Sequence, residues 1–123
     1  LLKTAPADVQ AHRKEYACRF AADHGAFLVL KGAGTLVAAP DGNLYRNTTG
    51  NPGMAKGGSG DVLAGIVSSL VAQGIEPFDA SALGVLLHGM AGRRAEERLG
   101  ERGVRAEDVT AEIAPTMHEF VGR

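Results

Sequence analysis

The sequence predicts an α/β domain, in which short strands lie among longer helices. Residues 26–30 form a short, wholly apolar run, whereas residues 62–73 and 78–99 repeat apolar side chains at helical spacing. Glycine supplies a third observation, because six of the 17 glycines fall between positions 50 and 65, around the start of a helix. The 123 residues suffice for one compact domain or for half of a larger one.

The first element along the chain is a helix, expected over residues 8–24. Tyr16 and Phe20 recur near the helical period, and Gly25 is typical of a helix end. Residues 26–30 then predict a strand that is buried on both faces, as in a parallel sheet covered by helices.

A second strand is expected at residues 35–39, after a turn at residues 31–34. Residues 40–43 read PDGN, a tight-turn signal that predicts a hairpin onto a third strand at residues 44–46. Three strands make a small sheet for an α/β fold. The chain is therefore expected to be part of a larger structure.

Three further helices are expected in the second half of the chain. The first covers residues 62–73, and the second covers residues 78–99. The last covers residues 106–121 and is expected to bend or break near Pro115, because proline lacks a backbone N–H.

The composition excludes several classes of protein. Thirteen Lys and Arg residues oppose 14 Asp and Glu residues, so a net charge of -1 gives no field that would draw the chain to nucleic acid or anionic lipid. No apolar run approaches the roughly 18–20 residues that span a bilayer, and no signal-peptide pattern is visible. The single cysteine, Cys18, fits a reducing compartment. A cytoplasmic protein with no nucleic-acid or membrane partner is expected.

The glycine-rich junction is typical of an anion site. Glycine lets the backbone approach a ligand closely, and a helix N-terminus supplies unpaired N–H groups and partial positive charge. Together these features favour phosphate. The irregular stretch before the helix contains Gly50, Gly53, Gly57, Gly58 and Gly60. The alternative interpretation is a glycine-rich loop with no ligand.

The spacing of these glycines matches neither of two familiar phosphate motifs. Residues 55–57 read AKG, where a P-loop that starts at Gly50 requires Gly-Lys-Ser/Thr. After residues 58–60, Leu63 occupies the position of the third glycine of a dinucleotide-binding fingerprint.

Asp61 follows the glycines directly. A carboxylate beside a phosphate cradle is unfavourable unless it has separate work, such as orienting a hydroxyl or contacting a metal. We expect Asp61 to position a hydroxyl more than to withdraw its proton. The alternative is an ordinary N-cap aspartate.

Residues 47–65 read NTTGNPGMAKGGSGDVLAG and resemble the signature of the ADP/ATP-dependent NAD(P)H-hydrate dehydratases, members of the ribokinase-like superfamily. The resemblance continues through residues 29–35 and 87–92, in order and with matching spacing. GGxGD alone indicates only the superfamily, whereas the TGNPGMA run before it is much more specific. The resemblance implies a three-layer α/β/α sandwich, with residues 1–123 as the C-terminal half of a single ribokinase-like domain.

The resemblance also implies a set of site residues. Asp61 matches the catalytic residue that meets the reacting hydroxyl of the substrate. The turn that lies along the adenine nucleotide comprises Lys31, Gly32, Ala33, Gly34 and Thr35. The loops that wrap its phosphates comprise Thr49, Gly50, Asn51, Pro52, Gly53, Met54, Ala55, Gly57, Gly58, Ser59 and Gly60.

Similar proteins repair hydrated NADH and NADPH. They transfer phosphate from ADP or ATP to the hydroxyl of the hydrate and then eliminate it, which restores NADH or NADPH. The resemblance therefore implies a hydro-lyase that binds ADP or ATP, and Mg²⁺ is expected because phosphoryl transfer usually requires it. No cluster of acidic ligands is visible in the sequence. Relatives often assemble as tetramers, so a homo-oligomer is expected.

Two departures from the family pattern bear on activity. Arg93 follows Gly92 at a position where relatives often carry an acidic residue. The family motif His-Pro-Gly-Glu, which helps to hold the substrate, would precede Leu1. We therefore expect these 123 residues alone to bind nucleotide weakly and to catalyse little. Two alternatives stay open, namely a ribokinase-like kinase of a vitamin precursor or sugar, and a non-catalytic nucleotide-binding module.

A thiol, an imidazole, a lysine and a run of charges are the remaining candidates in the sequence. Cys18 is expected to be a structural thiol, and His88 is expected to pack rather than to contact nucleotide. Lys56 either steadies a phosphate or lies in solvent. The charges of residues 93–98 predict a solvated helix face with an Arg93–Glu97 pair.

Overall fold

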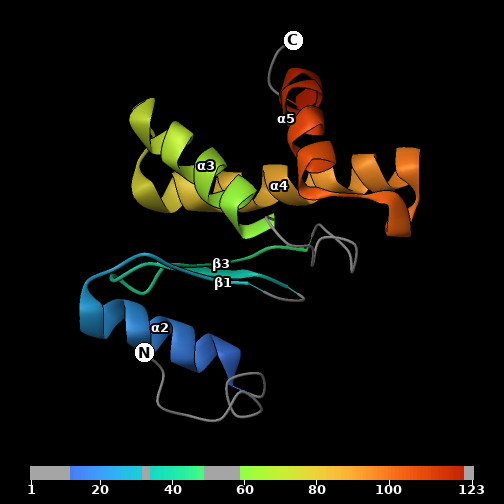
Figure 1. Ribbon diagram of the computed structural model, residues 1–123. Coiled ribbons are helices and arrows are strands. Elements are labelled where there is room, and N and C mark those ends of the chain that lie inside the picture. Colours follow the sequence, from blue (N-terminus) through green and yellow to red (C-terminus); the bar gives the residue numbers. More distant parts are fainter. Residues whose placement is uncertain (1–11, 32–33, 49–58, 121–123) are drawn as a thin grey trace.

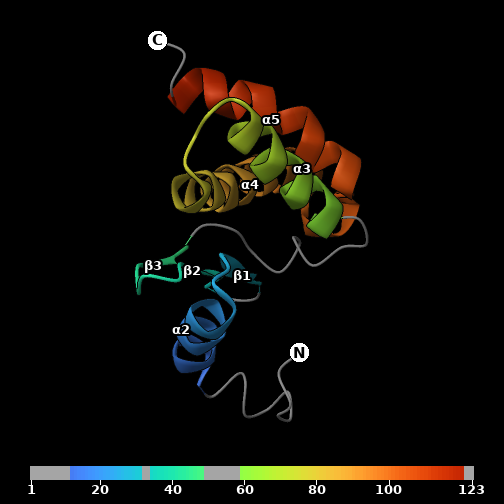
Figure 2. The ribbon, with the colours of Figure 1, turned by 90° about the vertical axis from the view of Figure 1, so that its left-hand side faces the viewer.

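The computed structural model describes residues 12–31, 34–48 and 59–120. The elements, in chain order, are α2 (Arg13–His24), β1 (Leu28–Leu30), β2 (Leu36–Ala38), β3 (Leu44–Arg46), α3 (Ser59–Ala72), α4 (Pro77–Leu99), η2 (Glu101–Gly103) and α5 (Ala106–Phe120). They form three layers, with α2 on one face of the sheet and the group of α3, α4 and α5 on the other (Figure 1, Figure 2). The predicted α/β class is confirmed.

The sheet has the order β1-β2-β3, and both neighbouring pairs are antiparallel. A hairpin joins β2 to β3, as predicted. The N–H of Ala39 donates to the carbonyl of Asn43 at 2.9 Å, and the N–H of Asn43 donates to the carboxylate of Asp41 at 2.9 Å. Gly42 takes φ 99°, a left-handed conformation that glycine adopts without steric cost.

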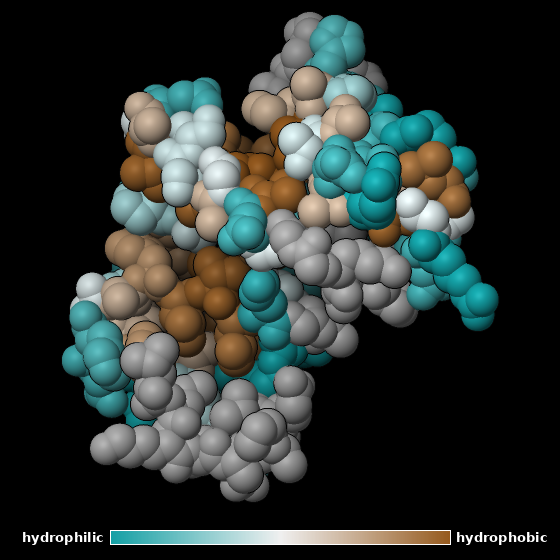
Figure 3. Space-filling model, in the orientation of Figure 1, coloured by the Kyte–Doolittle hydropathy of each residue, from teal (hydrophilic) through white to brown (hydrophobic). Residues whose placement is uncertain are grey.

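β1 departs from the prediction of a doubly buried strand in a parallel sheet. It runs antiparallel to β2, with Leu28 opposite Ala38 and Leu30 opposite Leu36. Helices do cover both faces of the sheet, but β1 is an edge strand among the described residues, and its side chains are half-buried. Figure 3 shows apolar surface along this side of the sheet. An apolar run indicates burial, but it does not specify the direction of pairing or the open edge.

α2 packs on the sheet through two alanines. Ala17 and Ala21 are fully buried and contact β2. Gly25 ends the helix with φ 57°, as predicted, and its N–H donates to the carbonyl of Ala21. Residues 8–11 of the predicted helix lie outside the described residues.

The opposite face of the sheet is covered by α3 and α4. Val37 of β2, Leu63 of α3 and Val85 of α4 belong to one buried cluster, which joins the sheet to the helices. The two helices approach each other closely at Gly84, where an added Cβ would stand 2.6 Å from the Cγ2 atom of Val67. A side chain at this position would force the helices apart.

α5 lies against α4 and is one continuous helix from Ala106 to Phe120, so of the predicted bend or break at Pro115 the break does not occur. Proline removes the N–H that would pair with the carbonyl of Ala111. Ala111 is exposed, so solvent can satisfy that carbonyl. The next side chain supports the helix, because the hydroxyl of Thr116 donates to the carbonyl of Glu112 at 2.6 Å.

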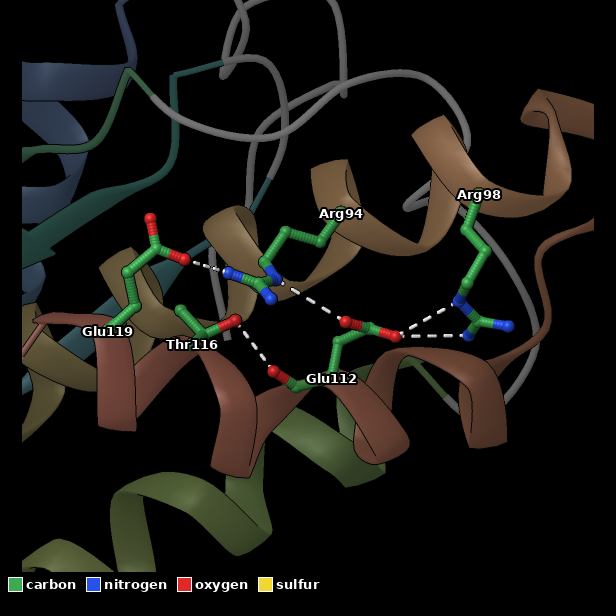
Figure 4. Close-up of polar contacts among 5 residues, drawn as sticks. All are labelled: Arg94, Arg98, Glu112, Thr116 and Glu119. Atoms are coloured by element: carbon green, nitrogen blue, oxygen red, sulfur yellow. Dashed lines mark hydrogen bonds and ion pairs between the residues drawn. The ribbon is translucent and has the colours of Figure 1, made fainter.

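Charged side chains join α4 to α5 (Figure 4). Arg94 donates to Glu112 at 3.4 Å and also pairs with Glu119, which is the main cause of the raised pKa of Arg94. Arg98 donates to Glu112 at 3.1 Å. The predicted Arg93–Glu97 pair is absent from the ion pairs of the described residues. Arginines of this run reach the neighbouring helix instead.

Candidate nucleotide site

The structure describes part of the predicted nucleotide site. α3 begins at Ser59, earlier than predicted, so Gly60 and Asp61 lie in its first turn. The described members of the site are Lys31, Gly34, Thr35, Ser59, Gly60 and Asp61. The predicted residues outside the described part are Gly32, Ala33, Thr49, Gly50, Asn51, Pro52, Gly53, Met54, Ala55, Gly57 and Gly58, together with Lys56.

Lys31 brings the two predicted segments together. It follows β1, and its ammonium group lies against the backbone of Gly60 at the start of α3. An added Cβ on Gly60 would stand 2.5 Å from the Nζ atom of Lys31. Glycine at position 60 therefore leaves room for the ammonium group beside the helix.

This arrangement is suited to an anion. The first N–H groups of α3 have no partner within the helix, and the helix dipole places partial positive charge at the same end. A lysine ammonium group there is unfavourable by itself, but both positive groups attract a phosphate placed between them. Within the part of the chain that the structure describes, Lys31 forms no ion pair with a carboxylate.

Asp61 lies in the first turn of α3, and its side chain is exposed. A carboxylate at this place stabilises the helix through the dipole, which fits the N-cap alternative in part. Among the described residues, Asp61 forms no ion pair. It therefore stays available to a substrate hydroxyl or to a hydrated cation on a phosphate.

Asn47 connects the end of the first segment, residues 31–35, to the start of the glycine-rich segment. Its N–H donates to the carbonyl of Thr35 at 2.8 Å, and its side-chain oxygen accepts from the hydroxyl of Tyr45 at 3.0 Å. Asn47 is 3% exposed, and burial raises the pKa of Tyr45. Sequence reasoning assigned no role to either residue. The signal was present in part, since Asn47 opens the family motif directly after β3.

Two arginines flank the first segment at Gly34. The guanidinium of Arg13 donates to the carbonyls of Leu30, Lys31 and Gly34 at 2.9, 3.3 and 3.2 Å. The guanidinium of Arg46 lies on Gly34, where an added Cβ would stand 3.0 Å from its Nε atom. Gly34 has φ 68°, so its backbone conformation also favours glycine. Sequence reasoning missed both arginines, because nothing in the local pattern links them to this turn.

Other predicted features have plain structural explanations. His88 is buried on α4, as the packing interpretation predicted. Cys18 is a half-buried free thiol on α2. No group of three or more metal-binding side chains occurs among the described residues. None of the described helices is long and apolar enough to cross a membrane.

Comparison with known proteins decides the family. A family described as NAD(P)H-hydrate dehydratase matches residues 1–115. The chain belongs to the NAD(P)H-hydrate dehydratase family. The bifunctional NAD(P)H-hydrate repair enzyme Nnr of Moorella thermoacetica is 50% identical over 109 residues, which are 89% of this chain and 21% of that protein. The ADP-dependent (S)-NAD(P)H-hydrate dehydratase of Neisseria meningitidis is 47% identical over 115 residues, 94% of this chain and 38% of that protein.

Solved structures agree with this family. The NAD(P)H-hydrate dehydratase from Bacillus subtilis, co-crystallised with ATP and Mg²⁺, superposes with a TM-score of 0.89 at 32% identity, over 93% of this chain and 41% of that one. YxkO of Bacillus subtilis gives a TM-score of 0.93 at 30% identity, over 98% of this chain and 45% of that one. The ribokinase-like α/β fold is therefore confirmed. The chain spans less than half the length of these relatives.

Proposed function

We propose that this chain carries the nucleotide-binding part of an enzyme that dehydrates hydrated NADH and NADPH with ADP or ATP. One observation supports this most strongly. In a chain of this family, the ammonium of Lys31 lies against Gly60 at the start of α3, and the next residue of the helix is Asp61, whose carboxylate is exposed. A phosphate site and a hydroxyl-positioning group thus share one helix end.

The two segments would divide the work. Residues 31–35 lie along the adenine nucleotide, and residues 49–60 wrap its phosphates. Lys31 and the N–H groups of α3 balance charge on the transferred phosphoryl group. Asp61 holds the substrate hydroxyl in line with the phosphorus atom.

The reaction would have two steps. In the first, the phosphorus–oxygen bond to the leaving AMP or ADP breaks while a bond to the substrate hydroxyl oxygen forms, and the hydroxyl proton is released. In the second, the carbon–oxygen bond breaks with loss of a proton from the neighbouring carbon, which restores the double bond of NADH or NADPH and releases phosphate. Phosphorylation makes the hydroxyl oxygen a good leaving group.

Mg²⁺ fits this site as a partner of the nucleotide. Mg²⁺ in phosphoryl-transfer sites keeps several waters and uses one or two carboxylates together with substrate phosphates. Asp61 is a carboxylate of the described residues that could take this part, and no larger acidic cluster is required. The ion would neutralise phosphate charge during transfer.

We also propose that the chain works as part of a larger domain. Residues 1–123 form the C-terminal portion of a single ribokinase-like domain, act in the cytoplasm and assemble as a homo-oligomer. By themselves, these residues are expected to bind nucleotide more weakly than the whole domain and to turn over little.

A coupled assay tests the function. A protein that carries the whole domain, with this chain as its C-terminal part, is given hydrated NADH with ADP or with ATP, and NADH is followed by its absorbance. The proposal expects NADH to form only when a nucleotide is present. A stable phosphorylated product from a thiazole or pyrimidine alcohol, without NADH formation from the hydrate, would instead assign a small-molecule kinase.

A further inference from the structure

The side chain of Arg13 crosses from α2 to the turn between β1 and β2. One guanidinium group donates to the carbonyls of Leu30 and Lys31, at the end of β1, and of Gly34, before β2. The donor–acceptor distances are 2.9, 3.3 and 3.2 Å, and the contacts to Leu30 and Gly34 are partly buried. A planar guanidinium can hold several acceptors in one fixed geometry, which a lysine ammonium cannot.

The stability and packing of α2 do not account for an arginine at position 13. Arg13 is the first residue of α2, where a cation opposes the helix dipole and is unfavourable. Ala17 and Ala21 already fix the helix on the sheet, since both are fully buried against β2. These three hydrogen bonds of Arg13 therefore connect the start of α2 to the segment between β1 and β2.

These contacts matter for an anion. The carbonyl oxygens of Leu30, Lys31 and Gly34 accept hydrogen bonds from Arg13, so a cation satisfies their negative ends. Lys31 belongs to the same turn, and its ammonium lies against Gly60. A turn with free carbonyls could rotate them toward a phosphate, which they would repel, and could move Lys31 away from α3.

We propose that Arg13 is a positioning residue of the nucleotide site: by binding the carbonyls of Lys31 and Gly34, it holds the backbone of Lys31 so that its ammonium lies at the start of α3. This inference rests on the proposed function, because it assigns Arg13 a part in nucleotide affinity. Arg13 does not touch the reacting atoms and acts through the turn.

The test compares Arg13→Gln with Arg19→Gln. Arg19 lies on the same helix and is exposed, so its loss changes the net charge equally without touching the turn. ADP is titrated by calorimetry into the wild-type 123-residue chain and both variants, and circular dichroism checks the fold. We expect Arg13→Gln to weaken ADP binding about tenfold, as loss of hydrogen bonds to a charged group allows. Arg19→Gln should bind like the wild type.

A second readout separates positioning from stability. In a protein that carries the whole domain, Arg13→Gln should raise KM for ADP about tenfold while kcat stays within about twofold, because only ground-state placement is lost. Arg13→Lys keeps the charge but loses the planar fork, so an intermediate affinity is expected. If Arg13→Gln does not fold, Arg13→Lys decides: weaker ADP binding supports the role, and unchanged binding overturns it.

The outcomes distinguish this inference from the proposed function. Equal ADP affinity of folded Arg13→Gln and Arg19→Gln, in a chain that does bind ADP, overturns the role of Arg13 and leaves the function intact. No ADP binding by the whole domain overturns both.

Discussion

At the scale of single residues, the candidate site depends on its glycines as much as on its charged side chains. Gly60 leaves space for the ammonium of Lys31 at the start of α3, and Gly34 leaves space for the guanidinium of Arg46. The family motif predicted both glycines as site residues. It could not predict which side chains fill the space, because Lys31 and Arg46 reach them from distant parts of the chain.

Asp61 is predicted to act on turnover rather than on nucleotide binding. Asp61→Asn should leave ADP affinity within about twofold and lower turnover by about 100-fold or more, because the substrate hydroxyl loses the carboxylate that places it in line. The matched control is Asp79→Asn, because Asp79 is exposed in the first turn of α4 and gives its helix the same dipole stabilisation. Equal turnover of the two variants would reduce Asp61 to a helix-capping residue.

Tyr45 is predicted to make stability depend on alkaline pH. Burial raises its pKa above the ordinary 10.0, so the neutral phenol is favoured in the folded chain. Its contribution is fully present below the unfolded pKa and is lost as the pH rises through the folded pKa. Tyr45→Phe removes the hydrogen bond to Asn47, so the free energy of unfolding should fall by about 0.5–1.5 kcal/mol at neutral pH. Above about pH 10, the stability of this variant should fall less steeply than that of the wild type.

Urea unfolding at a series of pH values measures both effects. Tyr16→Phe, on α2, is the control for loss of a phenol, since Tyr16 has no contact with Asn47. A Tyr45→Phe variant with the same alkaline slope as the wild type would remove Tyr45 as the cause.

At the scale of elements, the sequence predicted the features that depend on a few consecutive residues. It did not predict the features that depend on a distant partner. The PDGN turn specified the hairpin, and Gly25 specified the end of α2, because each depends on a few consecutive residues. The pairing of β1 depends on a partner strand, and the continuity of α5 depends on packing against α4. For the same reason the ion pairs of Glu112 could not be assigned from the charges of α4 alone.

The crossing of α3 and α4 predicts opposite effects for two glycines. Gly84→Ala should destabilise the chain by about 1–2 kcal/mol, because overpacking against Val67 outweighs the gain in helix propensity. Gly65→Ala should stabilise it by about 0.5–1 kcal/mol, because an added Cβ meets nothing within 4 Å there. Thermal unfolding of the two variants measures the difference. Two changes of the same sign would mean that helix propensity, and not the crossing, governs position 84.

At the scale of the whole molecule, three layers bring distant segments to one site. α2 supplies Arg13 from below the sheet, the strands supply the turn with Lys31, and α3 supplies the helix end from above (Figure 1). The resemblance to the family predicted which segments bind nucleotide. The structure confirms the order of the layers. The contacts between the layers could be identified only from the structure.

The most direct test of this site is a calorimetric titration of ADP into the 123-residue chain and two lysine variants. Lys31→Gln removes the ammonium at the start of α3, whereas Lys14→Gln removes an exposed ammonium of α2. We predict saturable ADP binding by the wild type, about tenfold weaker binding by Lys31→Gln and no change in Lys14→Gln. Equal affinities of all three chains, or the absence of binding, would contradict a phosphate site at the start of α3.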